Sequence, residues 1–263
     1  MAAGASTRWS GTTGRAASRD DTGVRAILGI DVHPLSEMRA IERIAEAVRK
    51  PGLTRIAFLN AHGANIAFRD RAFRDVLADF TVLPDGLGVD LCSRMHHGAP
   101  FPDNLNGTDF IPRLFDGIGR PCRVALFGAT PGIAREVARV WQARWPDHRF
   151  VALADGYEFD EARLLETLRQ DPADILLVAL GNPAQEKWIA GRIGPEHARV
   201  AIGVGALFDF AAGRVPRAPG WMIGLRLEWL HRLWLEPARM WRRYLLGNPL
   251  FMLRVLRSRP ARR

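Results

Sequence analysis

Several features that would narrow the function are scarce or absent in this sequence. Its two cysteines, Cys92 and Cys122, lie thirty residues apart without a partner motif, which argues against a disulfide framework or a thiolate metal site and indicates a reducing compartment. No stretch approaches the roughly 18–20 apolar residues of a spanning helix, so we expect no transmembrane segment. Residues 1–23 are rich in Ala, Gly, Ser, Thr and Arg and lack the apolar core of a signal peptide, so we expect a disordered N-terminal tail.

Common nucleotide-binding signatures are missing as well. The chain contains no Asp-x-Asp pair, no P-loop and no complete G-x-G-x-x-G. An Asp-x-Asp pair is the usual holder of the metal ion in nucleotide-sugar enzymes. A Rossmann-type oxidoreductase, one alternative function, would need the complete glycine fingerprint. Neither a metal site nor a bound cofactor is therefore expected.

What is present is a long alternation of strand-like and helix-like segments. A length of 263 residues with 48% hydrophobic residues is enough for a sizeable core. Strands that are apolar throughout are typical of a parallel sheet covered on both faces. We predict an α/β fold over residues 24–213, with a Rossmann-like, mostly parallel sheet and helices on both faces. The predicted strands are 24–30, 54–60, 80–84, 122–128, 149–155, 174–181 and 199–205, and the predicted helices are 36–49, 65–78, 87–97, 109–118, 132–145, 160–170, 184–192 and 206–212.

Small or polar residues follow four of these strands. The segments are Asp85–Gly86, Gly128–Gly132, Gly181–Ala184 and Gly203–Gly205. Parallel strands end at one edge of the sheet, where helix N-termini offer unpaired N–H groups, so we expect ligands to bind there. The turn "LFGATPG", with Gly128 and Thr130, is either a cradle for a diphosphate or simply a tight turn between a strand and a helix.

The stretch "GNPAQEKW" (181–188) predicts the start of a helix. Asn182 is expected to cap the helix that Pro183 begins, which places Gln185 in the first turn, facing the edge of the sheet. An amide there and the Trp188 indole one turn later would suit the polar edges and the ring of a nucleotide or sugar. The alternative for Trp188, a core side chain, is the commoner role of a tryptophan.

Residues 214–263 differ from the rest of the chain. They hold twelve arginines and two glutamates, which accounts for the whole net charge of +9, and four of the eight tryptophans. Within 221–246, Trp, Leu and Met alternate with Arg, and Pro237 breaks or kinks the helix. This pattern predicts a helix pair on an anionic membrane surface, where each Arg contributes about 1 kcal/mol. The alternatives are an ordinary packed C-terminal helix and a nonspecific nucleic-acid-binding tail, which the interspersed Trp and Leu disfavour.

Six ordered blocks of the sequence resemble one enzyme family, the WecG/TagA/CpsF glycosyltransferases (family 26). The resemblance covers roughly residues 26–256, and six blocks in the same order are more specific than any one of them. The blocks are "ADFTVLPDGLGVDL", "NGTDFIPRLF", "LFGATPG", "LLVALGNPAQEKWI", "GVGALFDFAAGRVPRAPGWM" and "GLRLEWLHRLWLEPARMWRRYLLGNP".

The resemblance implies a function and an architecture. Members move a sugar, with inversion, from a UDP-sugar to a sugar linked to undecaprenyl diphosphate, at the cytoplasmic face of the bacterial inner membrane, in the synthesis of surface polysaccharides. It also implies a Rossmann-like body with a C-terminal membrane-binding appendage (GT-E type), here residues 214–263, on a peripheral membrane protein. No specific nucleic acid is expected as a partner. Homo-oligomerisation away from the membrane is a further expectation.

Asp85, in "TVLPDGLGVD", is the expected catalytic base. An inverting transfer needs a base to take the proton of the acceptor hydroxyl as it attacks the anomeric carbon. The Asp of this block is the family's proposed base, so the resemblance gives Asp85 that role. From position alone, Asp85 is better explained as the cap of the helix that begins near Leu87.

Two positions depart from the family pattern. Phe58 stands two residues before Asn60 where the family often has Thr, and Asn104 in "FPDNLNGTD" stands where many members have Arg, so donor or acceptor recognition is expected to differ from that of the teichoic-acid enzymes. His62 in "NAHGAN" is either a substrate contact or a loop histidine without such a role. The expected substrate-binding residues are Asn60, His62, Asn104, Thr108, Asp109, Gly128, Thr130, Asn182, Gln185, Gly205 and Asp209.

Three arginines of the tail are expected near the donor diphosphate. Arg232, Arg239 and Arg242 would share one face of a continuous helix, since the last two lie about 20° and about 80° from the first at about 100° per residue, although Pro237 makes that continuity uncertain. If the tail docks over the edge of the sheet, this face reaches the diphosphate. The alternative is that all three contact lipid phosphates.

The missing Asp-x-Asp pair generates a first prediction. The negative charge that develops on the departing diphosphate would then be stabilised by helix N-termini, backbone amides and arginines. We expect glycosyl transfer to continue in EDTA at essentially the untreated rate. A rate that EDTA abolishes and Mg²⁺ or Mn²⁺ restores would reveal a metal site.

Overall fold

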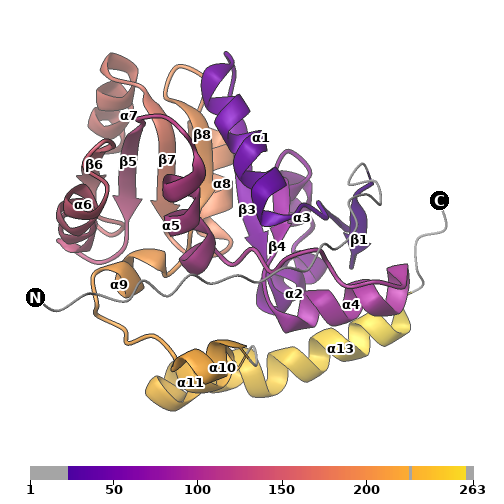
Figure 1. Ribbon diagram of the computed structural model, residues 1–263. Coiled ribbons are helices and arrows are strands. Elements are labelled where there is room, and N and C mark those ends of the chain that lie inside the picture. The colour runs from indigo at the N-terminus through magenta and orange to yellow at the C-terminus, as the bar shows by residue number, and fades with distance from the viewer. Residues whose placement is uncertain (1–22, 225–226, 259–263) are drawn as a thin grey trace, which may run out of the picture.

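The computed structural model describes residues 23–224 and 227–258 (Figure 1). Its centre is a six-stranded parallel sheet with the strand order β4-β3-β8-β7-β5-β6. The predicted N-terminal tail lies outside the described residues except for Gly23. The strands of the sheet are β3 (Thr54–Leu59), β4 (Thr81–Pro84), β5 (Arg123–Gly128), β6 (Arg149–Ala154), β7 (Ala173–Ala179) and β8 (Ala198–Gly203).

Helices cover both faces of the sheet, because successive strand residues point to opposite sides and both sides are apolar. Along β7, for example, Ile175 and Leu177 join one buried cluster, whereas Leu176 and Val178 join the other. The first cluster includes α1 (Glu37–Arg49), α5 (Gly107–Gly117), α6 (Ile133–Arg144) and α9 (Leu207–Ala211). The second includes α2 (Ala61–Arg69), α3 (Arg71–Leu77), α4 (Leu87–His97), α7 (Glu161–Gln170) and α8 (Ala184–Arg192). The predicted α/β architecture is confirmed.

Two predicted elements are wrong in detail. The expected strand over 24–30 is a small antiparallel hairpin, β1 (Arg25–Ile27) and β2 (Ile30–Val32), outside the main sheet, because Leu28 and Gly29 turn the chain with positive φ of 50° and 83°. The expected helix over 65–78 is two helices. Asp70 separates them: its extended backbone ends α2, and its side chain accepts a hydrogen bond from Phe73 N to cap α3.

The C-terminal segment runs beneath the carboxyl ends of the strands as five short helical pieces (Figure 1). The last of them, α13, packs along α2 and α4, and no separate helix was predicted there. Phe251 is buried against Gly88, where a Cβ would lie 3.5 Å from the Phe251 ring. The pieces are α10 (Gly220–Gly224), α11 (Glu228–Leu235), α12 (Pro237–Trp241), the π-helical turn η1 (Arg242–Leu246) and α13 (Gly247–Arg257). Across the described residues, no helix is both long enough and apolar enough to span a bilayer.

Asn65 fastens α13 to the α/β body. This buried side chain donates from Nδ2 to the Gly247 carbonyl oxygen at 2.7 Å, and its Oδ1 accepts from Arg254 at 2.6 Å. One amide therefore holds both the start and the middle of α13, and losing it would leave a buried carbonyl and a guanidinium without these partners.

Asn65→Ala should lower the free energy of unfolding by about 1–3 kcal/mol, the usual cost of unpairing buried polar groups. Urea denaturation followed by circular dichroism measures this. Arg242→Ala, at an exposed position of the same C-terminal segment, is the control and should change stability by less than about 0.5 kcal/mol. Equal effects of the two substitutions would show that the Asn65 contacts do not hold the segment.

Candidate active site

A cavity of about 710 Å³ lies at the carboxyl ends of the parallel strands. The loops after β3, β4, β7 and β8 supply Asn60, Asp85, Asn182 and Gly205 to its wall, so the edge that the sequence predicts does collect these residues. The C-terminal segment closes the other side, with Glu228, Trp229 and Arg232 from α11, Arg243 and Tyr244 from η1, and Phe251 and Met252 from α13.

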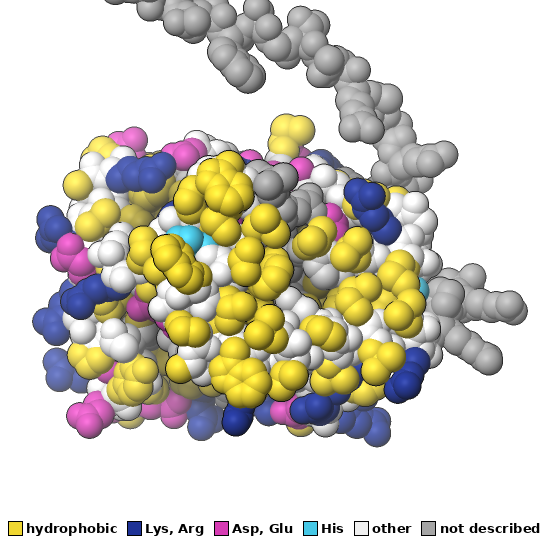
Figure 2. Space-filling model, turned by 90° about the horizontal axis from the view of Figure 1, so that it is seen from below, with side chains coloured by type: hydrophobic (Ala, Val, Ile, Leu, Met, Phe, Trp, Pro, Cys, Tyr) yellow, Lys and Arg dark blue, Asp and Glu magenta, His cyan; other side chains and the backbone are white. Residues whose placement is uncertain are grey.

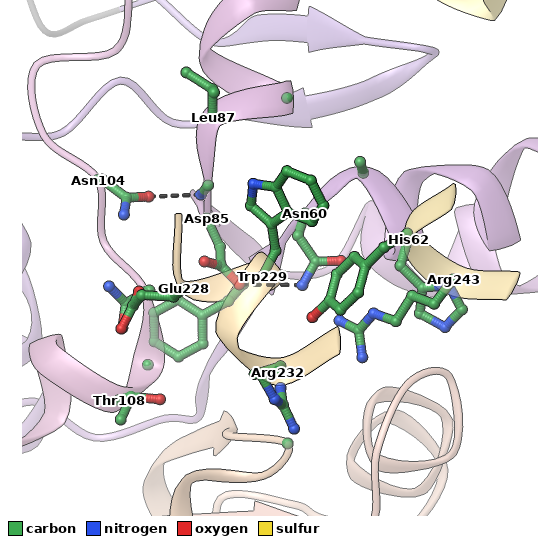
Figure 3. Close-up of a pocket in the computed structure, with 18 of the residues that line it drawn as sticks. Asn60, His62, Asp85, Leu87, Asn104, Thr108, Glu228, Trp229, Arg232 and Arg243 are labelled. Carbon is green, nitrogen blue, oxygen red and sulfur yellow. Dashed lines mark hydrogen bonds between the residues drawn. The ribbon is translucent and has the colours of Figure 1, made fainter. Parts of the chain in front are cut away.

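Asp85 lies at the centre of this constellation (Figure 3). Its backbone N–H donates to the Leu59 carbonyl oxygen at 2.9 Å, and its carboxylate Oδ2 accepts from Asn60 Nδ2 at 3.1 Å. Next to it, Gly86 has a φ of 95°, which favours glycine, and its N–H donates to Asn104 Oδ1 at 2.6 Å. Gly86 itself is the N-cap residue of α4 and no side chain caps that helix, so Asp85 is not a helix cap.

The protonation of Asp85 is set by opposing effects. Burial raises the pKa of the carboxyl above its ordinary 3.8, while the hydrogen bond from Asn60 and the positive charges of Arg243 and Arg232 lower it. Burial prevails, and the negative charge of Asp109 adds to the rise. The site thus holds a carboxylate whose proton affinity is higher than that of an exposed aspartate.

His62 is neutral at physiological pH. Burial and the nearby charge of Arg243 lower the pKa of its imidazole to about 4. It lines the cavity from the first turn of α2, a helix that Asn60 caps by accepting from Gly63 N at 3.0 Å. The sequence pattern placed His62 in a loop, whereas the structure places it in helix α2.

Two residues that sequence reasoning missed form a second charged group in the cavity. Arg217 contacts Asp109 at 2.6 Å and Glu228 at 3.3 Å, and all three line the wall. Burial raises the pKa of Glu228, and the charge of Asp109 adds to this. Asn106 orients Asp109 by donating to its carboxylate at 2.9 Å, and Thr108 follows on the same wall. The pairing of Arg217 with Asp109, 108 residues away, and with Glu228, 11 residues away, left no periodic signal in the sequence.

The arginines of the C-terminal segment are arranged differently from the prediction. Arg232 lines the cavity, with its guanidinium 5.1 Å from the centre of the Phe210 ring and its buried Nε without a partner in the described part of the chain. Arg243 lines it too, whereas Arg242 is exposed beside the Trp241 ring. The segment over 232–242 is not a continuous helix, because α11 ends before Glu236 and a π-helical turn begins at Arg242, so the face that a continuous helix would share does not include Arg242. The side chain of Arg239 lies outside the described residues.

The loop after β7 also differs from its prediction. Asn182 does not cap α8: its Nδ2 donates to Glu186 Oε1 at 2.5 Å, and Pro183 is the N-cap residue without a side-chain bond. Gln185 lines the cavity but is almost fully buried. Trp188 packs against the Phe127 ring, 4.6 Å between ring centres, and donates to Glu161, so it is a core side chain.

Three expected substrate-binding residues do not line this cavity: Gly128, Thr130 and Asp209. At Gly128, where φ is 111°, a Cβ would lie 2.5 Å from the Ala179 carbonyl oxygen, so glycine is required for the close approach of β5 and β7. That geometry agrees with a tight turn between strand and helix. In the described chain, no three His, Cys, Asp or Glu side chains are grouped as metal ligands.

The chain is similar to known proteins over most of its length. The model of the "Glycosyl transferase WecG/TagA/CpsF family" matches residues 25–263. A protein of Bacillus subtilis strain 168 is 34% identical over 206 residues, which is 77% of this chain and 79% of that protein. One of Staphylococcus aureus strain MRSA252 is 22% identical over 245 residues, 92% of this chain and 95% of its own length. Both are named N-acetylglucosaminyldiphosphoundecaprenol N-acetyl-beta-D-mannosaminyltransferase.

The raised pKa of Asp85 generates a prediction about stability. Since the folded pKa lies above the unfolded value of about 3.8, the wild-type chain loses stability as pH rises from that value through the folded pKa. Asp85→Asn removes the ionisation, so the variant should be more stable than wild type at pH 8, by a margin larger than at pH 3, where the carboxyl is protonated in both states. Urea denaturation at both pH values measures the margin, with Asp147→Asn as the exposed-carboxylate control. A wild type that is the more stable at pH 8 would contradict the burial effect.

Proposed function

The chain belongs to the WecG/TagA/CpsF family of glycosyltransferases, and from this premise we propose that it transfers a sugar, with inversion, from a UDP-sugar to the sugar of an undecaprenyl-diphosphate-linked acceptor. The observation that carries the proposal is Asp85, a half-buried carboxylate that accepts a hydrogen bond from Asn60, in a cavity that Arg232 and Arg243 also line. Family membership does not favour the two alternatives, nucleic-acid binding and oxidoreduction.

Asp85 is the base in this proposal. The acceptor hydroxyl oxygen attacks the anomeric carbon, the bond from that carbon to the UDP oxygen breaks with both electrons going to UDP, and the hydroxyl proton passes to Asp85. Burial raises the pKa of this carboxyl, which brings its proton affinity closer to the operating pH and so makes it a better base. Asn60 fixes one carboxylate oxygen, so the other, Oδ1, remains for the hydroxyl.

Arg232 and Arg243 are the proposed partners of the departing diphosphate. Both lower the pKa of Asp85 through their charge, which means that they lie close enough to act electrostatically on the reacting atoms. Guanidinium groups bind phosphate oxygens in a planar, two-pronged manner, and in an enclosed cavity they stabilise the charge that develops on UDP. Arg243 takes the role that was expected of Arg242, because Arg243 lines the cavity and Arg242 is exposed.

The lipid-linked acceptor is proposed to enter from the side of α4 and α13. That part of the cavity wall is apolar and consists of Leu87, Leu91, Phe251 and Met252. Leu87 and Leu91 are also exposed, so apolar surface continues from the cavity to the outside. The relatives' names state an acceptor with a diphosphoundecaprenol group, whose prenyl chain needs such a surface.

The same side of the molecule is proposed to lie on an anionic membrane. Figure 2 shows hydrophobic side chains over the middle of this face and Lys and Arg near its margin. A large exposed apolar area with Trp and Arg is typical of an interfacial membrane site. We place it on the cytoplasmic face of the bacterial inner membrane. The exposed apolar residues of the C-terminal segment are Trp221, Leu230, Trp234, Leu235, Trp241, Leu245, Leu246, Leu253 and Leu256.

The transferred sugar is proposed to be an N-acetylhexosamine, for a surface polysaccharide. The relatives are named as N-acetylmannosaminyltransferases. This chain carries Phe58 in the cavity wall, where it packs edge-on against Phe110 and 3.2 Å from a Cβ built on Gly107. The ring stands where the family often has Thr, so a hydroxyl contact is lost there, and we propose that donor or acceptor recognition differs from that of the teichoic-acid enzymes.

Release of UDP from a panel of UDP-hexoses and UDP-N-acetylhexosamines, in the presence of a prenyl-diphosphate-linked N-acetylglucosamine, tests the proposed reaction. At least one donor should give the new disaccharide. Asp85→Asn should then lower turnover by about 10²–10⁴ while the donor still binds, because the shape of the site is kept and the base is lost. Near-normal turnover of this variant would remove Asp85 from the mechanism.

Substitutions of the cavity arginines should lower turnover, whereas substitution of an exposed tryptophan should lower membrane binding. Arg232→Ala and Arg243→Ala should each lower turnover by about 10–1,000-fold, as does loss of a group that stabilises charge in the transition state, with little change in flotation on anionic liposomes. Trp234→Ser should reduce flotation but retain turnover on a detergent-solubilised acceptor. Arg242→Ala is the control and should retain turnover. Parallel loss of flotation and turnover in the Arg232 and Arg243 variants would make these residues membrane anchors instead.

A further inference from the structure

Glu186 is a fully buried carboxyl beside the cavity that the reaction above does not use. It lies in the first turn of α8 with 0% of its side chain exposed, and none of the salt bridges between described residues includes it. Its Oε1 accepts two hydrogen bonds, from Asn182 Nδ2 at 2.5 Å and from Gln185 Nε2 at 2.7 Å. Its Oε2 is buried and has no partner among the residues described. Burial of such a group costs stability, which points to a task beyond packing.

The two amide side chains are oriented by that single oxygen. Because both NH₂ groups point at Glu186, both amide oxygens point away from it. The Gln185 oxygen accepts from Gly181 N at 3.2 Å and from Gly205 N at 2.9 Å, so it joins the loop after β7 to the loop after β8. Gly203 makes room for this arrangement, since a Cβ there would lie 2.7 Å from Gln185 Nε2.

Asn182 keeps its amide oxygen for a ligand. Its Nδ2 is engaged by Glu186, no hydrogen bond to its Oδ1 occurs within the described chain, and the residue lines the cavity. This part of the wall, at the end of β7, is separated from β4 and the apolar wall at α4 by the strands β3 and β8. If the prenyl chain of the acceptor enters at α4, the polar end of the cavity is left for the donor.

We propose that Glu186 is a positioning residue for the donor: it fixes the Asn182 and Gln185 amides so that Asn182 Oδ1 accepts a hydrogen bond from an N–H or O–H group of the nucleotide-sugar. The inference rests on the proposed glycosyl transfer only for the identity of that ligand. A neutral acid suffices for the task, because one carbonyl oxygen accepts both amides. Burial raises the pKa of Glu186, which favours the neutral form.

Two substitutions test the proposal through donor binding, measured by calorimetry with UDP and UDP-N-acetylhexosamines. Glu186→Gln keeps a carbonyl oxygen for both amides, so its affinity should stay within about 3-fold of wild type, whereas Glu186→Leu removes the acceptor and should weaken binding by about 10–100-fold. The donor KM should rise accordingly, while the acceptor KM stays within about 2-fold. Glu161→Leu is the matched control. Glu161 lies in α7, away from the cavity, and this substitution breaks its contact to Trp188, which is in the same helix as Glu186.

The proposal is overturned if Glu186→Leu binds the donor as wild type does, if Glu186→Gln is as impaired as Glu186→Leu, or if donor and acceptor KM rise together. Should Glu186→Leu not fold, Asn182→Ala decides: it keeps Glu186 and should lose donor affinity by a similar factor, and normal affinity would refute the role of Asn182. When both variants fold, the double variant should be no weaker than Glu186→Leu alone. A wild-type protein that binds no nucleotide-sugar of the panel would refute the proposed donor class itself. Results on the Glu186 variants test only the role of Glu186 and leave the donor class untouched.

Discussion

The Asp85 carboxyl at the end of β4 is partly withdrawn from water, and several polar and charged groups of the cavity wall act on it. Asn60 donates to Asp85, Asn104 holds the adjacent Gly86 backbone, and arginines from a segment far along the chain supply positive charge. An unpaired buried charge would be neutralised or expelled, whereas a charge that is too well paired would be a poor proton acceptor. At Asp85, burial raises the pKa, and Asn60, Arg243 and Arg232 limit the rise.

The C-terminal segment has two parts with different attachments to the body. Helix α13 contributes the buried Phe251 and Val255 to the core, and Asn65 holds it by hydrogen bonds. Helix α11 and the turn η1, which carry Arg232 and Arg243, bury none of their residues fully. The electrostatic groups of the cavity therefore come from the less firmly packed part, and their placement relies on the docked helix that follows them. Packing of α13 and the positions of Arg232 and Arg243 in the cavity wall are linked by this continuity of the chain.

The strands and most helices could be predicted because apolar runs and helical periodicity reflect burial on both faces of a parallel sheet. The hairpin at Leu28 and Gly29 and the break at Asp70 were missed, since each depends on the backbone angles of only one or two residues. The gathering of Asn60, Asp85, Asn182 and Gln185 followed from the rule that parallel strands end at one edge. Arg217, Glu228 and Arg243 were missed because Arg217 lies in an irregular segment, Glu228 begins α11 and Arg243 lies in a π-helical turn, where helical spacing gives no guide to direction.

The turn η1 shows why sequence spacing alone does not predict the direction of a side chain. In a π-helical turn each N–H bonds to the carbonyl five residues back, so the turn holds one residue more than an α-helical one, and the side chains that follow are rotated relative to the preceding helix. Arg242 and Arg243 are adjacent, yet only the second faces the cavity. When homologous chains are aligned, arginines in the same column can therefore do different jobs, and the same job can shift by one column without any change in composition.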